Sequence, residues 1–274
     1  MFSESVCKLN EQEIEALVEA IVAQSMPTPR ARKRLATILQ DTPARRVAFD
    51  QGAVTAWRLG EGPALLLAHG AFDDHILWAP LMAAAVARGH SIVVLDMPGL
   101  GHSADADRGI DHGASALLAV AEAMGPVHTV MGHSVGAVSA VRALLSGLSA
   151  QKAVLFASAL PTRWDLWVLE RKVVAPDDAP AIAIARARER LKAPPTGPQF
   201  DFDVEAAVRG FRIPALLAHS RDDPHWSWRT SEIIASRWLG AKTHYVDDLD
   251  HRAIARDLGV IGVVLDFVEQ TPLE

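Results

Sequence analysis

The sequence contains a single cysteine, Cys7, among its 274 residues. An internal disulfide is therefore excluded, and nothing suggests a thiolate metal site. Basic residues are also few, since 27 Lys and Arg stand against 33 Asp and Glu and the formal net charge is −6. Because contacts with phosphates need a basic surface, this balance argues against nucleic acid as a partner.

Long apolar runs are lacking as well. The longest, such as residues 258–265, are far shorter than the roughly 20 residues of a membrane-spanning helix. The N-terminus shows no cationic stretch followed by an apolar core, which a signal peptide requires. We therefore expect a cytoplasmic protein with no membrane partner.

What is present is typical of a large globular domain. Half of the residues are hydrophobic and 22% are charged, a composition far from that of a disordered chain. Residues 1–44 are predicted to form an N-terminal helical extension. Asn10 and Glu13 have capping-box spacing before a helix over residues 10–24, and a second helix is expected over residues 31–40. This extension either covers an edge of the main domain or builds the contact of a homo-oligomer.

From residue 45 onward, short apolar runs alternate with helical patterns. Residues 45–50 and 54–59 predict a hairpin. Further strands are predicted at 64–70, 91–98, 127–132, 152–158, 214–220 and 243–248, with helices at 77–88, 114–124, 136–145, 228–239 and 253–268. Because the runs are apolar on both faces, the predicted fold is α/β, with a mostly parallel doubly wound sheet covered by helices on both sides.

One interval interrupts this alternation. About 55 residues separate the strand that ends near residue 158 from the strand that begins near residue 214, more than a crossover needs. We predict that residues 161–211 form a helical lid over the carboxyl edge of the sheet, where open α/β folds bind substrates. The predicted core then comprises residues 45–160 and 212–274.

The pentapeptide Gly-His-Ser-Val-Gly at residues 132–136 lies between a predicted strand and a predicted helix. A sharp turn there forces its middle residue into strained backbone angles, and glycines two positions before and after remove side-chain clashes. The hydroxyl of Ser134 would then stand at a helix N-terminus, where N–H groups stabilise negative charge. This setting predicts that Ser134 is a nucleophile, the alternative being an ordinary glycine-rich turn.

A serine nucleophile needs a base and a group that orients the base. In an α/β arrangement these partners are expected at the carboxyl ends of later strands, in the order Ser, Asp, His. His251 follows the last predicted strand and is the candidate base; His225, beside the acid loop, and His244, inside a strand, are poorer choices. Asp222 and Asp223 both end the strand 214–220, and the pattern leaves both open as the acid.

The reaction also needs hydrogen-bond donors aimed at a developing oxyanion. One is the backbone N–H of Val135, the residue after the nucleophile. The other is expected from the loop after strand 64–70, where the glycine of residues 69–71 lets the backbone approach closely.

Several ordered motifs resemble the α/β-hydrolase superfamily, in its serine-nucleophile branch. They are LLLAHGA at residues 65–71, VVLDMPGLGHS at 93–103, GHSVG at 132–136, an Asp loop and a late His, and the resemblance covers residues 45–270. The resemblance implies a catalytic triad of Ser134, Asp223 and His251. It also implies an oxyanion hole formed by the N–H groups of Ala71 and Val135.

Two departures from the family pattern concern the acid and the base. Ser220 stands where members commonly have Gly before the acid, and Asp250 precedes His251 where many have Gly. Asp165, past the preceding strand, is an alternative acid because some members draw theirs from that position. Asp96 is expected to shape its loop rather than to act in catalysis.

Four aromatic side chains are candidates to bind substrate: Phe72, Trp78, Trp164 and Trp226. They would favour an apolar or aromatic substrate, and the small size of the predicted lid favours a small or medium one. The alternative is that tryptophans in this region simply pack the lid onto the sheet.

The leading hypothesis is a serine hydrolase of small molecules that cleaves an ester-type bond through an acyl-enzyme on Ser134, with no cofactor and no metal. A serine at the elbow excludes the branches of the family that use an aspartate nucleophile. One alternative is a C–C hydrolase of ring-cleavage products, whose carboxylate substrate would need an arginine such as Arg163 or Arg186. The other is a ligand-binding protein on the same scaffold.

Overall fold

The computed structural model describes residues 10–25, 30–31, 34–103, 106, 109–159, 180–192 and 202–270. The chain divides into two compact units. The smaller combines Met1–Thr28 with Arg163–Gly197, and the larger combines Pro29–Thr162 with Pro198–Glu274. Within the described ranges, every helix is too short or too polar to cross a bilayer.

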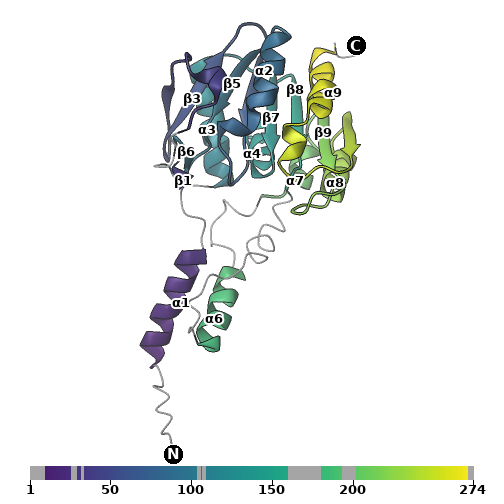
Figure 1. The fold of residues 1–274 in the computed structure, drawn as a ribbon. Coiled ribbons are helices and arrows are strands. Elements are labelled where there is room, and N and C mark those ends of the chain that lie inside the picture. The colour runs from purple at the N-terminus through teal and green to yellow at the C-terminus, as the bar shows by residue number, and fades with distance from the viewer. Residues whose placement is uncertain are drawn as a thin grey trace, which may run out of the picture. The chain divides into compact units, whose positions relative to one another are not determined.

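The larger unit is built on an eight-stranded sheet with the order β10-β9-β8-β7-β4-β5-β3-β2 (Figure 1). The strands are β2 (Arg45–Phe49), β3 (Gly52–Leu59), β4 (Ala64–Ala68), β5 (Ser91–Leu95), β7 (Thr129–His133), β8 (Lys152–Phe156), β9 (Ala215–Ser220) and β10 (Ala241–Val246). Strand β3 pairs antiparallel with β2 and β5, whereas the pairs from β5 across to β10 are parallel. The predicted α/β fold, with its hairpin at one edge, is confirmed.

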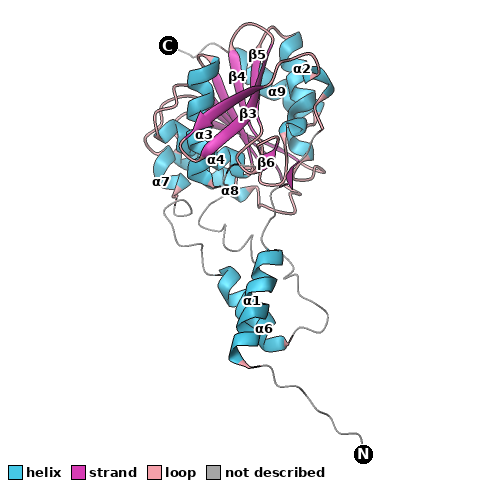
Figure 2. Ribbon diagram, turned by 90° about the vertical axis from the view of Figure 1, so that its left-hand side faces the viewer, coloured by secondary structure: helices cyan, strands magenta, loops and turns pink. Residues whose placement is uncertain are grey.

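Helices cover both faces of this sheet (Figure 2). On one face α2 (Ala79–Ala87) contacts α9 (Leu258–Glu269). On the other face, α3 (Ile110–Met124) contacts α4 (Val135–Leu145), α4 contacts α7 (Val204–Val208), and α7 contacts α8 (Arg229–Arg237). Every residue of β4, β5, β7, β8 and β9 is consequently buried, which explains why their sequences are apolar on both faces.

Short elements complete the larger unit. Strand β1 (Arg30–Ala31) pairs in parallel with β6 (Leu100–Gly101). The 3-10 helices among the described residues are η1 (Thr37–Leu39), η2 (His75–Trp78) and η5 (Ala253–Ala255). A side chain caps the N-terminus of α9. Asp257 accepts a hydrogen bond from the N–H of Val260 at the start of α9.

At the other end of α9, the Nζ of Lys152 donates hydrogen bonds to three backbone carbonyls. Its contacts with the oxygens of Phe267 and Val268 are 2.9 and 2.7 Å, and it also reaches the oxygen of Gln270. Lys152 begins β8 and is buried. The lysine therefore ties the last helix to the middle of the sheet.

The smaller unit contains α1 (Glu11–Ser25) and α6 (Ala181–Lys192), which pack together. Val18 and Ile21 of α1 are fully buried against Ala183 and Ala187 of α6, whose small side chains let the helices approach closely. An ion pair joins Arg186 to Glu11. Segments far apart in the sequence thus share one apolar interface.

The predicted capping box of α1 is confirmed. The N–H of Asn10 donates to Glu13 Oε2 at 2.7 Å, and the N–H of Glu13 donates to Asn10 Oδ1 at 3.0 Å. Residues 160–179 and 193–201 lie outside the described residues, so that the lid over the carboxyl edge stays a prediction.

The helix predicted over residues 31–40 is wrong. Residues 34–36 are irregular, and only the single turn of η1 follows. Ala36 has an extended backbone, and its N–H donates to His75 Nε2 at 3.1 Å. A long-range partner that no local pattern can reveal has replaced the helical bond.

Candidate active site

Ser134 occupies the sharp bend between β7 and α4. Its φ of 55° and ψ of −121° lie in a region that residues with a side chain seldom adopt. A Cβ on Gly132 would lie 2.4 Å from Ala137 Cα, and one on Gly136 would lie 2.3 Å from the carbonyl oxygen of Ala68. Only glycine fits at either position, so the motif is needed for the bend that carries Ser134.

Asp223 and His251 meet at the ends of neighbouring strands. Asp223 follows β9, His251 follows β10, and Asp223 Oδ2 lies 2.7 Å from His251 Nδ1. The other oxygen, Asp223 Oδ1, accepts hydrogen bonds from the N–H groups of His225 and Trp226 at 2.8 and 3.1 Å. Asp222 instead accepts from the N–H of Asp248 at 2.8 Å. Of the two carboxylates that the pattern left open, Asp223 is the one that contacts His251.

The carboxylate of Asp223 is ionised despite its burial. Desolvation alone would raise its pKa, but hydrogen bonds from His219 and His251 outweigh that effect and hold the pKa well below its usual value. An ionised carboxylate accepts a hydrogen bond from the Nδ1–H group of His251, which keeps the proton on Nδ1. That tautomer leaves the lone pair of Nε2 available to take a proton from a hydroxyl.

The turn that carries His251 is anchored beside the elbow. His133, which directly precedes Ser134, donates from Nε2 to the carbonyl oxygen of His251 at 2.6 Å. The two imidazole rings are 4.7 Å apart. Among the described residues, Ser134 Oγ makes no hydrogen bond to the His251 ring; catalytic hydrogen bonds of this kind commonly tighten only when substrate binds.

The loop after β4 approaches the same elbow. A Cβ on Gly70 would lie 3.1 Å from Ser134 Cβ and 3.0 Å from His133 Nδ1, so this loop runs directly against the bend. In the part of the chain that the structure describes, the N–H groups of Ala71 and Val135 have no hydrogen-bond acceptor. This is compatible with the oxyanion hole that the sequence predicts.

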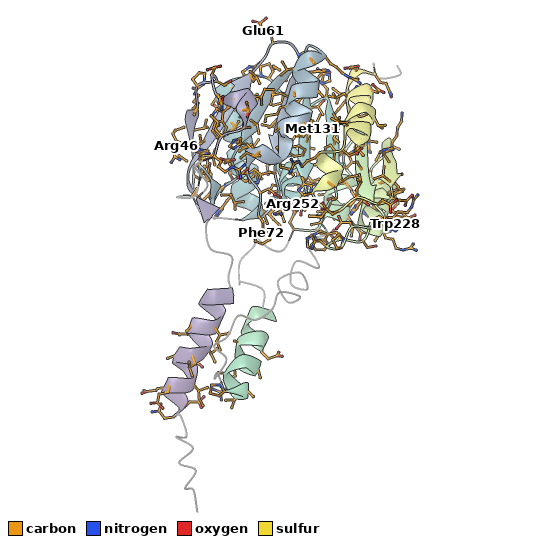
Figure 3. The ribbon with its side chains drawn as sticks, in the orientation of Figure 1. Arg46, Glu61, Phe72, Met131, Trp228 and Arg252 are labelled. Atoms are coloured by element: carbon orange, nitrogen blue, oxygen red, sulfur yellow. The ribbon has the colours of Figure 1, made fainter. Side chains whose placement is uncertain are left out.

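The candidate substrate-binding aromatics have different environments. Phe72 and Arg252 lie at one edge of the larger unit, opposite Glu61 (Figure 3). Trp226 is buried and holds Asp223 through its backbone. Trp78 is fully buried and makes an edge contact with His133, the residue before Ser134. Trp164 lies outside the described residues.

Two arginines, Arg163 and Arg186, and one alternative acid, Asp165, were also candidates from the sequence. Arg186 pairs with Glu11 inside the smaller unit. Arg163 and Asp165 lie outside the described residues.

His219 is one of the residues that sequence reasoning missed. It is fully buried, with its Nε2 lying 3.1 Å from the carbonyl oxygen of Trp226 and 3.3 Å from Asp223 Oδ2. Its Nδ1 lies 2.7 Å from Ser231 Oγ. The available signal was a histidine inside an otherwise apolar strand, four residues before Asp223.

A second missed feature is an ion pair between two loops of the site. Arg252 donates from Nε to Asp73 Oδ1 at 2.7 Å and from Nη2 to the carbonyl oxygen of Phe72 at 3.4 Å. It thereby links the turn after His251 to the loop after β4. Nothing in the local sequence around either residue indicated this pairing.

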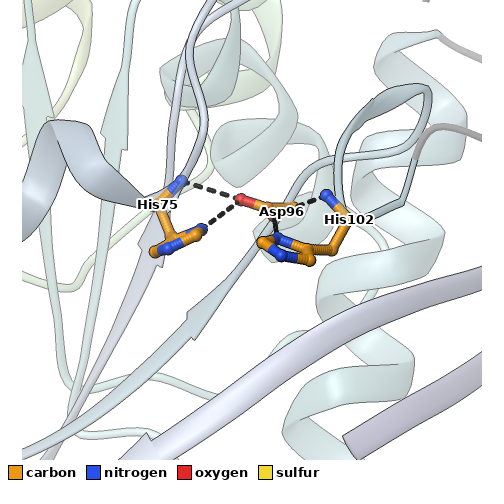
Figure 4. Close-up of side chains that lie close together, drawn as sticks. All are labelled: His75, Asp96 and His102. Carbon is orange, nitrogen blue, oxygen red and sulfur yellow. Dashed lines mark hydrogen bonds and ion pairs between the residues drawn. The ribbon is translucent and has the colours of Figure 1, made fainter. Parts of the chain in front are cut away.

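Asp96 shapes its loop, as its sequence context suggested (Figure 4). Its Oδ1 accepts from the backbone N–H and Nδ1 of His75 at 2.7 and 2.8 Å, and its Oδ2 accepts from the same two groups of His102 at 2.7 and 2.9 Å. Because His75 Nε2 accepts from Ala36, its proton is on Nδ1, which leaves no lone pair there for a metal. The three side chains form a hydrogen-bond network.

Comparisons with known proteins agree with this architecture. A model of the alpha/beta hydrolase family matches residues 65–260. No curated protein matches the chain in sequence. The fold is similar to that of an esterase from Exiguobacterium antarcticum, with a TM-score of 0.65 at 14% identity, covering 83% of this chain and 100% of that one.

Two further solved structures are similar at comparable levels. A carboxylesterase from Bacillus subtilis has a TM-score of 0.64 at 16% identity and covers 94% of this chain and 99% of its own. A putative non-heme bromoperoxidase from Mycobacterium tuberculosis has a TM-score of 0.62 at 18% identity, with 79% and 97% covered. At these identities the likeness concerns the fold.

Proposed function

This chain belongs to the alpha/beta hydrolase family, and we propose on that basis that it is a carboxylesterase-like serine hydrolase. The single observation that carries the proposal is the strained Ser134 at the elbow, with the hydrogen-bonded pair Asp223–His251 anchored beside it. The strained backbone angles have a cost that an ordinary turn would avoid, and such strain persists mainly at functional sites.

In the proposed reaction, His251 Nε2 takes the proton of Ser134 Oγ as the oxygen attacks the carbonyl carbon of an ester. The N–H groups of Ala71 and Val135 stabilise the negative charge on the carbonyl oxygen, each contributing on the order of 3 kcal/mol. Collapse of this intermediate breaks the bond to the leaving alcohol, which receives the proton from His251. Water, deprotonated by His251, then attacks the acyl carbon, the bond to Ser134 Oγ breaks, and His251 returns the proton to Ser134 as the acid leaves.

The substrate class that we propose is a small or medium ester with an apolar or aromatic part. Support comes from Phe72, a partly buried aromatic residue in the loop that also supplies the Ala71 N–H group. Two buried tryptophans add apolar surroundings: Trp78 contacts the ring of His133, and the N–H of Trp226 binds Asp223.

The test is covalent labelling of the folded protein by a fluorophosphonate, beside hydrolysis of p-nitrophenyl esters of increasing acyl length. We expect labelling and turnover in the parent and neither in Ser134→Ala. The control is Ser146→Ala at the end of α4, away from the site. A folded parent that resists the probe, or that binds an ester and returns it intact, would contradict the proposal.

A further inference from the structure

His133 is a buried histidine to which the proposed reaction gives no role. It ends β7 directly before Ser134 and is fully buried. Its Nε2 lies 2.6 Å from the carbonyl oxygen of His251. Since a carbonyl oxygen can only accept, Nε2 carries the proton and Nδ1 carries the lone pair.

That lone pair has no hydrogen-bond partner within the described residues. The nearest carboxylate oxygen, Asp73 Oδ2, is 4.0 Å away, beyond hydrogen-bond range. A buried acceptor without a partner opposes folding. Phe156, the residue of β8 in register with His133, shows that an apolar ring fits this layer. A histidine at this position therefore needs a reason other than packing.

We propose that His133 is a positioning residue for the general base, holding the turn of His251 against the nucleophile elbow through its Nε2–H bond to the His251 carbonyl oxygen. The inference rests on the proposed roles of Ser134 and His251. One hydrogen bond joins the residue before the nucleophile to the residue that carries the base. The rings of His133 and His251, 4.7 Å apart at an interplanar angle of 51°, add a second contact to the same pair.

The state of His133 suits this role. Burial, followed by repulsion from a protonated His251, lowers its pKa to about 3. It thus stays neutral when His251 takes up a proton, and it does not compete as a base because its Nε2 is already a donor. Its Nε2–H group therefore stays available to the His251 carbonyl oxygen when His251 is protonated.

Three substitutions separate the donor from the bulk of the side chain. His133→Gln places an amide N–H near the position of Nε2, His133→Asn places one near Nδ1, and His133→Leu supplies none. The matched control is His90→Leu, because His90 is also buried with an unpartnered Nδ1 but directly precedes β5, at the amino ends of the parallel strands, whereas His133 lies at the carboxyl end of β7.

We expect kcat to fall roughly 10- to 100-fold in His133→Leu and His133→Asn, with KM nearly unchanged, because a base held out of place slows the chemistry and leaves binding intact. His133→Gln should keep most of the rate, and His90→Leu should match the parent. Equal losses in all three His133 variants would overturn the inference, because ring packing would then explain them. Parental rates in His133→Leu would overturn it as well.

Hydrogen exchange measured by mass spectrometry tests the contact without any reaction. Peptides that span residues 248–254 should exchange faster in His133→Leu and His133→Asn than in the parent or His133→Gln. Unchanged exchange in His133→Leu overturns the inference even if the chain proves to be a serine hydrolase. Conversely, a parent that resists the fluorophosphonate overturns the proposed function, while the exchange experiment still shows whether His133 holds the turn.

Discussion

At the scale of single residues, the two glycines of the elbow leave no room for a methyl group. Gly136→Ala would place a Cβ 2.3 Å from the carbonyl oxygen of Ala68, so that α4 must move away from β4. We expect a loss of roughly 1–3 kcal/mol in the free energy of unfolding. Ester hydrolysis should fall by more than this loss of stability alone would cause, because the bend carries Ser134. Urea denaturation and ester hydrolysis measure the two effects.

The control for this substitution is Gly262→Ala in α9, where an added Cβ meets nothing within 4 Å. Helix propensity predicts a stability equal to that of the parent or higher by up to about 1 kcal/mol, with parental activity. If Gly136→Ala behaved in the same way, the elbow would be less constrained than its contacts indicate.

Asp223 and Asp222 are neighbours with different partners, which makes them a matched pair. Asp223→Asn removes the negative charge that selects the tautomer of His251, and kcat/KM should fall roughly 10⁴-fold. Asp222→Asn alters only a contact with the N–H of Asp248 and should keep activity near the parental value. Ester hydrolysis at saturating and limiting substrate measures both. A larger loss of kcat/KM in Asp222→Asn than in Asp223→Asn would show that Asp222, and not Asp223, is the acid.

The buried His133 makes stability depend on pH. Its pKa is about 3 in the folded chain and 6.5 when exposed, because burial, followed by repulsion from a charged His251, outweighs attraction to Asp73 and Asp223. As the pH falls from 6.5 toward 3, the unfolded chain takes up a proton that the folded chain does not, and stability is lost. Urea denaturation across this range should show a steeper loss in the parent than in His133→Gln. Parallel curves would contradict the expectation.

Residue patterns in the sequence were sufficient for part of the site. The spacing of Gly132, Ser134 and Gly136 reflects local backbone sterics, and the position of His251 follows from strand order, so both were accessible. The choice between Asp222 and Asp223 depends on which side of a turn faces His251, which adjacent letters do not encode. His219 contacts the carboxylate of Asp223, and this contact depends on the folded position of both residues.

At the scale of elements, buried strands were the most predictable feature because being apolar on both faces requires a sheet covered on both sides. The observed limits of the strands and helices differ from the predicted ones by a few residues. The helix expected over residues 31–40 failed because His75 supplies the partner of the Ala36 N–H from a distant loop. The five-residue helix α7 has too few turns for a periodic pattern.

Lys152 determines how the last helix ends. Lys152→Met would leave the carbonyl oxygens of Phe267 and Val268 without their buried donor, at a cost of about 1–3 kcal/mol in the free energy of unfolding. Lys242→Met, on the exposed edge strand β10, should change stability little. Thermal or urea denaturation measures both. Equal effects would mean that the helix end contributes nothing measurable.

At the scale of the whole molecule, the helix pair α1–α6 has its own apolar interface. Val18→Asp places a charge in that interface, where Val18 is fully buried. We expect limited proteolysis to speed up at residues 11–25 and 181–192 together, while the melting of the larger unit is unchanged. Ala16→Asp, on the exposed side of α1, is the control. Faster cleavage of one helix alone would contradict their mutual support.

The same pairing has a consequence for synthesis on the ribosome. Helix α1 ends at Ser25, but its partner α6 ends only at Lys192. At a translation rate of about 5–20 residues per second, the apolar stripe of α1 waits roughly ten to thirty seconds before its partner has been made. During that interval the nascent chain presents an unpaired amphipathic segment ahead of the growing sheet, a natural target for a chaperone.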